Sequence, residues 1–301
     1  MSNRRSVYTG LVSGIVSALS FGASPLFARH LYAAGFSVEA VLFFRFFPVM
    51  LILGTVLLFS KQLRFTRSEF FSRLISGVIF TITSFLLFLS YRNLDVGLAA
   101  AILFLYPVYV VLVEMVFFKK KLTFPVLAAL LLALAGVAGL SINSVGSVAV
   151  SGLVLALLSG VCYAGYQVFV SHAPALPALK QTFIINTVCA LFYLVRVIPV
   201  WQEQVTFTLE VCLNIAGVSL ISALLATYGA VVCLQKCGAV LTGILGALEP
   251  LTAVVLGIVC FNENAGFLKM TGIILILGAV LILALDQKRA GSQQPDEAHT
   301  S

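Results

Sequence analysis

The chain has 301 residues, of which 61% are hydrophobic and only 10% are charged, and its mean hydropathy is +1.11. Soluble domains average about 25% charged residues, so this composition excludes an ordinary water-soluble fold and indicates a membrane protein. The formal charge of +7 lies mainly in short loops, where membrane orientation explains it better than nucleic-acid binding does.

Apolar stretches of about 20 residues, the length that a helix needs to cross the hydrocarbon core, follow one another along nearly the whole chain. Basic, polar or proline-containing connections separate them, such as Lys119 to Lys121 and the pair Pro174 and Pro177. We predict ten transmembrane helices, which in chain order span 7–28, 38–60, 70–90, 96–118, 124–142, 151–171, 179–200, 211–234, 238–260 and 267–285. The first is expected to be an uncleaved helix, and the polar tail 287–301 a disordered cytoplasmic segment.

The first half of the chain is repeated in the second half. A stripe of small residues at four-residue spacing occurs at an offset of 142: Gly10, Gly14, Ala18 and Gly22, then Gly152, Ala156, Gly160 and Ala164. Pro107 and Pro250 match at an offset of 143. Close helix packing alone explains the stripe, but its duplication indicates two five-helix domains, 7–142 and 151–285. Because five is odd, the second repeat is predicted to be inverted, an arrangement typical of secondary transporters.

The loop charges predict the orientation. With the N-terminus in the cytoplasm, ten helices place both termini inside and most lysines and arginines on the cytoplasmic side. Four basic residues fall outside and one within a helix: Arg29, Arg92, Arg196 and Lys269, and then Arg45. We therefore expect a multi-pass protein of the cell (inner) membrane.

Glu249 is the principal candidate for chemistry. It lies about half-way along the ninth predicted helix and directly precedes Pro250, which tends to kink the helix. The equivalent position in the first repeat is Tyr106, before Pro107. Charges at this depth are costly, and helices broken at matching positions point to a site between the repeats. We predict that Glu249 binds substrate or a proton; the alternative is a structural carboxylate bonded to a neighbour such as Arg45.

Two further charged residues are candidates for ion pairing or coupling. Arg45 lies about two helical turns into the second helix, and structural pairing is the favoured role over contact with an anionic substrate. Glu114 lies about one turn from the cytoplasmic end of the fourth helix, where an ion pair with Lys119 to Lys121 is expected. Glu39, near the outer mouth, is expected to be solvated.

Aromatic and polar side chains at similar depth are the candidates for the wall of a substrate cavity. They are Phe21, Ser20, Ser24, Tyr106, Tyr109, Tyr163, Tyr166, Gln167 and Tyr228. Aromatic walls with a few polar groups are typical of small-molecule sites, and such rings near Glu249 would also bind a cation. Since the chain has 24 Phe and 9 Tyr, packing within helix interfaces is the alternative role for each of them.

Motifs of catalysis are absent from the sequence, which contains no P-loop, GxSxG, HExxH or CxxC. We therefore predict no catalytic residues, no metal site and no cofactor. The six cysteines are interpreted as small apolar packing residues. His30 and His172 occupy equivalent positions at helix ends, on opposite membrane faces, which excludes a joint metal site. No ATP-binding module is found in the sequence, so any pumping would use an ion gradient, such as that of protons, a substrate gradient, or a partner protein.

Several segments carry a resemblance that spans nearly the whole chain, from Gly10 to Leu285. They are Arg45-Phe46, Leu98 to Pro107, Gly152 to Gln167, Leu248 to Pro250, and Phe261 to Glu263. Their order and duplication resemble the drug/metabolite transporter superfamily, specifically its EamA-type ten-helix branch. One departure is that the family's Gly-Glu-Arg-type turn keeps an acidic Glu263 in the second copy, whereas the first copy has Lys119 to Lys121.

The resemblance implies a secondary active transporter that exports or exchanges amino acids, amines, drugs or other metabolites by alternating access. Its expected partners are a small-molecule substrate, the lipid bilayer and a proton or counter-substrate, with no nucleic acid, in a monomer or homodimer. One alternative is a nucleotide-sugar or phosphate-ester exchanger, which would need several basic residues at the midplane, where only Arg45 is found. The other is a membrane-embedded lipid-modifying enzyme, which would need paired carboxylates or a His/Ser cluster that the sequence lacks.

Overall fold

The computed structural model describes residues 2–62, 66–90, 102–141, 150–174, 176–200, 206–261 and 266–292, and their regular secondary structure is entirely helical. Six segments are long and apolar enough to cross a membrane: Ser6–Ala33, Val38–Phe59, Glu69–Leu87, Val150–His172, Ala178–Val200 and Leu209–Leu245. Shorter apolar helices cover Tyr106–Phe118, Phe124–Gly139, Leu248–Cys260 and Met270–Ile282. The chain is therefore an integral multi-pass membrane protein.

In the described part of the first repeat, the first apolar stretch is divided into two helices. Its described helices are α1 (Ser2–Gly22), α2 (Ser24–Ala33), α3 (Val38–Phe59), α4 (Arg67–Ser90), α6 (Tyr106–Phe118) and α7 (Phe124–Ser141). Pro25 lies in the first turn of α2, where its missing N–H costs nothing, and α1 ends just before it. The predicted start of the fourth helix, at 96, lies outside the described residues.

The second repeat is less regular. It contains α8 (Val150–His172), α9 (Ala178–Val197), the 3₁₀ turn η1 (Ile198–Val200), α10 (Leu209–Ala216), the π-helix η2 (Gly217–Leu225), α11 (Ala226–Leu245), α12 (Leu248–Phe261) and α13 (Phe267–Ser292). The predicted boundary between the eighth and ninth helices coincides with Gly238, whose φ of +79° and ψ of 173° break the helix within α11. At the C-terminus, α13 continues beyond the predicted end at 285, and 293–301 lie outside the described residues.

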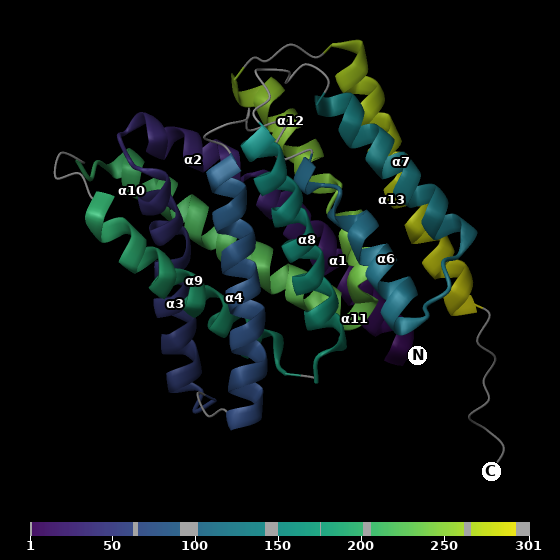
Figure 1. Ribbon diagram of the computed structural model, residues 1–301, viewed down its shortest axis with the longest axis horizontal. Coiled ribbons are helices and arrows are strands. Elements are labelled where there is room, and N and C mark those ends of the chain that lie inside the picture. Colours follow the sequence, from purple (N-terminus) through teal and green to yellow (C-terminus); the bar gives the residue numbers. More distant parts are fainter. Residues whose placement is uncertain are drawn as a thin grey trace.

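The two repeats pack reciprocally. α1 packs on α11 and α12, and its counterpart α8 packs on α4 and α6, the equivalent helices of the other repeat. The remaining helices pair with their own counterparts, α3 with α9 and α7 with α13, at opposite edges of the molecule (Figure 1). Each repeat therefore covers the apolar faces of the other.

Small residues permit the closest of these contacts. Gly10 and Gly14 of α1 lie against Cys237 and Cys233 of α11, so a side chain on either glycine would collide with a thiol. In α7, Gly136 lies against the Gly272 carbonyl of α13. Such close backbone approach is how helices associate in lipid, where burial of apolar side chains gives no driving force.

Candidate functional site

Helices of both repeats are broken at equivalent positions. A turn at Phe104 and Leu105 precedes α6, and a turn at Gly246 and Ala247 precedes α12. Each new helix has a proline in its first turn, Pro107 in α6 and Pro250 in α12, where a missing N–H is tolerated. Backbone groups that are unpaired at a helix break cannot face lipid, so at membrane depth they must be surrounded by protein or line an aqueous cavity. Broken helices at equivalent positions of two repeats are for this reason typical of transporter binding sites.

Glu249 stands in the first turn of α12 and is only partly buried. In the described part of the chain, its carboxylate accepts no hydrogen bond and forms no ion pair, and the charge that acts on it is that of Arg45. Gly22 of α1 lies against the Glu249 backbone carbonyl and Thr252, so α1 covers the break closely. The described side chains therefore leave the Glu249 carboxylate without a hydrogen bond or an ion pair.

A chain of tyrosine rings lies beside Glu249. The Tyr106 and Tyr163 rings meet edge to face with centroids 4.6 Å apart, and Tyr163 stacks on Tyr166 at 5.9 Å. Both Tyr106 and Tyr163 are close enough to feel the Glu249 charge, and the Gln167 amide, whose oxygen accepts no hydrogen bond from the described residues, lies near both hydroxyls. Tyr106 comes from α6, and the other three residues of this chain of contacts come from α8, so both repeats build the cluster.

Arg45 of α3 is held by backbone and by aromatic rings. Its Nη2 donates a hydrogen bond of 2.8 Å to the Ser222 carbonyl in η2, and its guanidinium lies 5.6 Å from the Phe21 ring centroid. The carbonyl oxygen of Ser222 has two lone pairs, so it can accept this bond in addition to one within the helix. The arginine therefore donates to a helix carbonyl and does not close an ion pair with Glu249.

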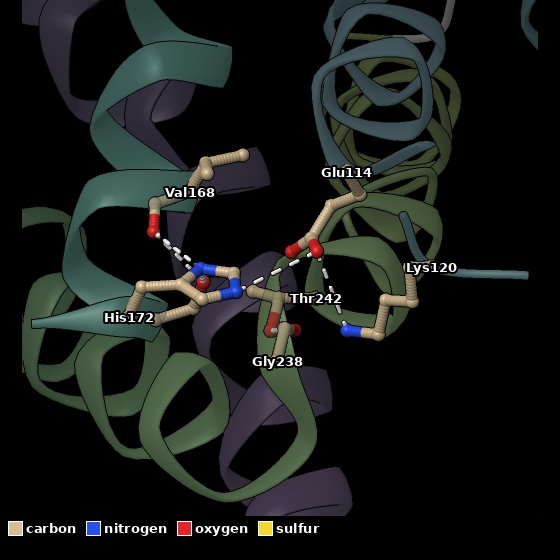
Figure 2. A network of polar contacts seen from close by, with 7 residues as sticks. Glu114, Lys120, Val168, His172, Gly238 and Thr242 are labelled. Carbon is tan, nitrogen blue, oxygen red and sulfur yellow. Dashed lines mark hydrogen bonds and ion pairs between the residues drawn. The ribbon is translucent and has the colours of Figure 1, made fainter. Parts of the chain in front are cut away.

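Glu114 of α6 is almost fully buried, at 1% exposure, and lies 3.6 Å from Nζ of Lys120 and 3.7 Å from Nε2 of His172 (Figure 2). The lysine is one of the three that sequence reasoning considered as partners. The histidine was not considered, because its helix is far from Glu114 in the chain. No local pattern could have identified this contact.

The other candidates occupy different surroundings. Ser20 is buried on α1, Ser24 begins α2, and Tyr109 packs against Gly160 of α8. Tyr228 is 40% exposed. The expectation for Glu39 was wrong: it is 8% exposed and lies 3.7 Å from Nη2 of Arg196, so it is paired across α3 and α9 rather than simply solvated.

Sequence reasoning also missed Phe80 of α4, whose ring lies 5.0 Å from Tyr166 and 6.3 Å from Tyr163. No signal distinguishes it from the other phenylalanines in the sequence. Over the described residues, no group of three or more His, Cys, Asp or Glu side chains could hold a metal ion.

Two helical repeats that pack on each other, each with a helix broken beside a buried polar cluster, have the architecture of a membrane transporter. The family model of the EamA-like transporter family matches residues 8–142 and 150–285, and the chain belongs to this family. The two matched segments coincide with the two repeats of the sequence.

Comparison with solved structures supports the fold. A structure described only as "Crystal structure of protein" shares 18% sequence identity and covers 94% of this chain and 99% of its own, with a TM-score of 0.71. At this identity the likeness concerns the fold alone. A search of curated proteins finds no match.

Proposed function

We propose that the protein is a secondary active transporter that exports or exchanges small organic metabolites, such as amino acids, amines or drugs, by alternating access. The observation that carries the proposal is Glu249: its carboxylate lies at a helix break between the repeats, near the charge of Arg45 but without a hydrogen bond or ion pair from the described residues. A deep carboxylate is expensive in free energy, so its retention beside a helix break favours a functional role.

The surroundings of Glu249 support a positively charged group in the substrate. The rings of Tyr106 and Tyr163 lie beside the carboxylate, and aromatic faces and a carboxylate both attract an ammonium group. Among the described residues, Arg45 is the guanidinium whose charge acts on Glu249, and one of its N–H groups is already bonded to the Ser222 carbonyl. A phosphate ester would need more positive charge than this, so the exchanger of nucleotide sugars or phosphate esters is the weaker alternative.

The reciprocal packing supports alternating access. Since α1 packs on α11 and α12 just as α8 packs on α4 and α6, the same set of contacts exists twice, related by exchange of the repeats. Ten helices in two inverted repeats would place these sets at opposite membrane faces, so that rocking opens one while closing the other. In this arrangement both termini are cytoplasmic, the membrane is the cell (inner) membrane, and a proton or counter-substrate drives transport by a monomer or homodimer.

The experiment begins with a thermal-shift screen of the purified protein against amino acids, amines, nucleosides and drugs, followed by uptake of the best hit into proteoliposomes. We expect Glu249→Gln to weaken binding of the hit by at least about tenfold, since a charge-assisted contact contributes about 1.5–3 kcal/mol. We also expect this variant to lose the dependence of uptake on a pH gradient.

The matched control is Glu210→Gln, which removes an exposed carboxylate from the first turn of α10. This variant should bind and transport as the wild type does. Unchanged affinity and unchanged pH-gradient dependence in Glu249→Gln would disprove the assigned role of Glu249. The absence of any stabilising ligand in the screen would count against a metabolite transporter.

A further inference from the structure

The buried Glu114 carboxylate lies at the end of the molecule that carries Lys119 to Lys121, which we call the lysine end. The Glu114 side chain is 1% exposed, whereas those of its partners Lys120 and His172 are 52% and 35% exposed. Neither carboxylate oxygen accepts a hydrogen bond from the described residues. A carboxylate taken out of water stays ionised only when nearby cations compensate for its lost hydration. Lys120 and His172 are the cations in position to do so.

This cluster connects the two repeats. Glu114 and Lys120 belong to the first repeat and His172 to the second, and Glu114 lies between the two cations (Figure 2). The Phe118 ring of α6 stacks on the His172 ring with centroids 3.7 Å apart. Lys120 Nζ also lies beside Gly238, only 3.6 Å from where a β-carbon would be. The end of α6, the end of α8 and the break in α11 therefore meet at one point.

The orientation of the His172 ring decides what the ring can offer to Glu114. Nδ1 lies 3.1 Å from the Val168 carbonyl oxygen and 3.0 Å from Ser171 Oγ, and which of these contacts it makes as a donor depends on the tautomer of the ring. Ser171 Oγ also lies 2.9 Å from the Val168 carbonyl oxygen, to which it can donate. Nε2 faces the Glu114 carboxylate at 3.7 Å, and neither neutral tautomer brings a net charge there. Only the doubly protonated imidazolium adds a positive charge beside Glu114.

The position that corresponds to Glu114 in the second repeat is not acidic. His30, which occupies the position of His172 in the first repeat, has the same local contact, with Nδ1 2.8 Å from the Leu26 carbonyl oxygen. The position that corresponds to Glu114 at an offset of 143 is Gly257, which has no side chain. The acid of the cluster is therefore present in one repeat only.

We propose that Glu114, Lys120 and His172 form a proton-dependent latch that holds the two repeats together at the lysine end. Protonation of His172 closes the latch, and loss of that proton leaves Lys120 as the single cation on Glu114. Only the role of the latch in transport, namely that the lysine end must open during a transport cycle, rests on the proposed function. The latch itself can be tested on protein without substrate.

Other charged or titratable groups near this end include Glu69, Arg73, Lys119, Lys121, Lys180, Lys236 and Cys237. The comparison of the wild type with His172→Gln separates His172 from all of them. A pH effect that disappears with His172 is therefore assigned to His172.

The first test compares thermal unfolding of the purified full-length protein at about pH 5.5 and about pH 7.5. We expect the wild type to melt about 2–4 °C above His172→Gln at the lower pH, and the difference to vanish at the higher pH. His30→Gln is the matched control, because it removes the repeat-equivalent histidine, for which the position corresponding to Glu114 is Gly257, and it should retain the wild type's pH-dependent difference from His172→Gln. Equal pH dependence in the wild type and His172→Gln would overturn the latch, as would an equal effect of His30→Gln.

The second test measures opening itself by amide hydrogen exchange in 114–122 and 236–242, corrected for the intrinsic effect of pH on exchange. In the wild type these segments should exchange several-fold more slowly at about pH 5.5 than at about pH 7.5. His172→Gln and Glu114→Gln should remove that difference; should Glu114→Gln fail to fold, His172→Gln alone decides. Exchange that keeps its pH dependence in His172→Gln rejects the proposal. If the exchange data agree with the latch but no transport is found for any substrate, the latch stands and the proposed transport function is refuted.

Discussion

Tyr106 shows how one hydroxyl group is positioned by residues of the opposite repeat. Its oxygen donates a hydrogen bond of 3.2 Å to the Gly243 carbonyl in α11 and lies near the Gln167 amide in α8. It also occupies the space that a β-carbon at position 246 would fill. The helix break before α12 therefore requires glycine at position 246 in order to accommodate the tyrosine of the other repeat.

This arrangement predicts the effect of Gly246→Ala. The new methyl group would overlap the Tyr106 hydroxyl, so Tyr106 must move away from Glu249 or the break must open, at a cost of about 1–3 kcal/mol. We expect a lower melting temperature and at least about tenfold weaker binding of the ligand found by thermal shift, since about 1.4 kcal/mol corresponds to a factor of ten. Gly165→Ala in α8 is the control, because no atom lies near its added carbon. Wild-type affinity in Gly246→Ala would show that Tyr106 does not contribute to the site.

At the scale of the element, the break in α11 depends on a single backbone conformation. Gly238 has φ +79° and ψ 173°, a region that is open to glycine and strained for residues with a side chain. We expect Gly238→Ala to lower the free energy of unfolding by about 1–3 kcal/mol, measured by thermal or denaturant unfolding in detergent.

Gly278→Ala in α13 is the control for this prediction. Its added carbon meets no neighbour, and alanine favours a helix over glycine by up to about 1 kcal/mol, so this variant should be as stable as the wild type or slightly more stable. Equal stability of Gly238→Ala and Gly278→Ala would mean that the break tolerates a side chain.

The elements differ in how far the sequence could predict them. Hydropathy was sufficient for the long apolar helices, because twenty apolar residues in a row have few other stable locations. Pro107 and Pro250 indicated the breaks before α6 and α12 through their missing N–H groups. The π-helix η2 was not predictable, because its wider turns are stabilised by tertiary contacts such as the hydrogen bond from Arg45 to Ser222.

The candidate site was less predictable than the fold. Depth and repeat equivalence selected Glu249, Tyr106 and Tyr163, which the structure brings together. The same reasoning could not place Phe80 beside Tyr166, nor pair Glu39 with Arg196, because these contacts depend on how separate helices cross. The pairing of Glu114 with His172 has the same origin.

At the scale of the whole molecule, the repeats depend on each other for their packing partners. In isolation, the first repeat would leave the faces of α1 and α4 that pack on α11 and α8 exposed to lipid. Their small residues contribute little without a closely fitting helix opposite. Neither half should therefore form a stable structure alone, although the two together should.

A split between 142 and 149, between the two matched segments, tests this dependence. We expect the two halves to co-purify through a tag on one of them when they are expressed together, and each half to be degraded when it is expressed alone. A split inside α8, after Tyr163, is the control, because it divides a helix that packs on both α4 and α6. Stable accumulation of the first half alone would contradict the reciprocal packing as the source of stability.

The one-sided cluster at Glu114 has a consequence for the resting state of the molecule. If the two repeats were identical, conformations open to opposite ends would have equal free energies and equal populations. A contact made at one end only shifts that balance by its own free energy, tenfold for each 1.4 kcal/mol or so. If protonation of His172 closes this contact, the proton concentration on one side of the membrane would bias the conformation in which the substrate-free protein rests.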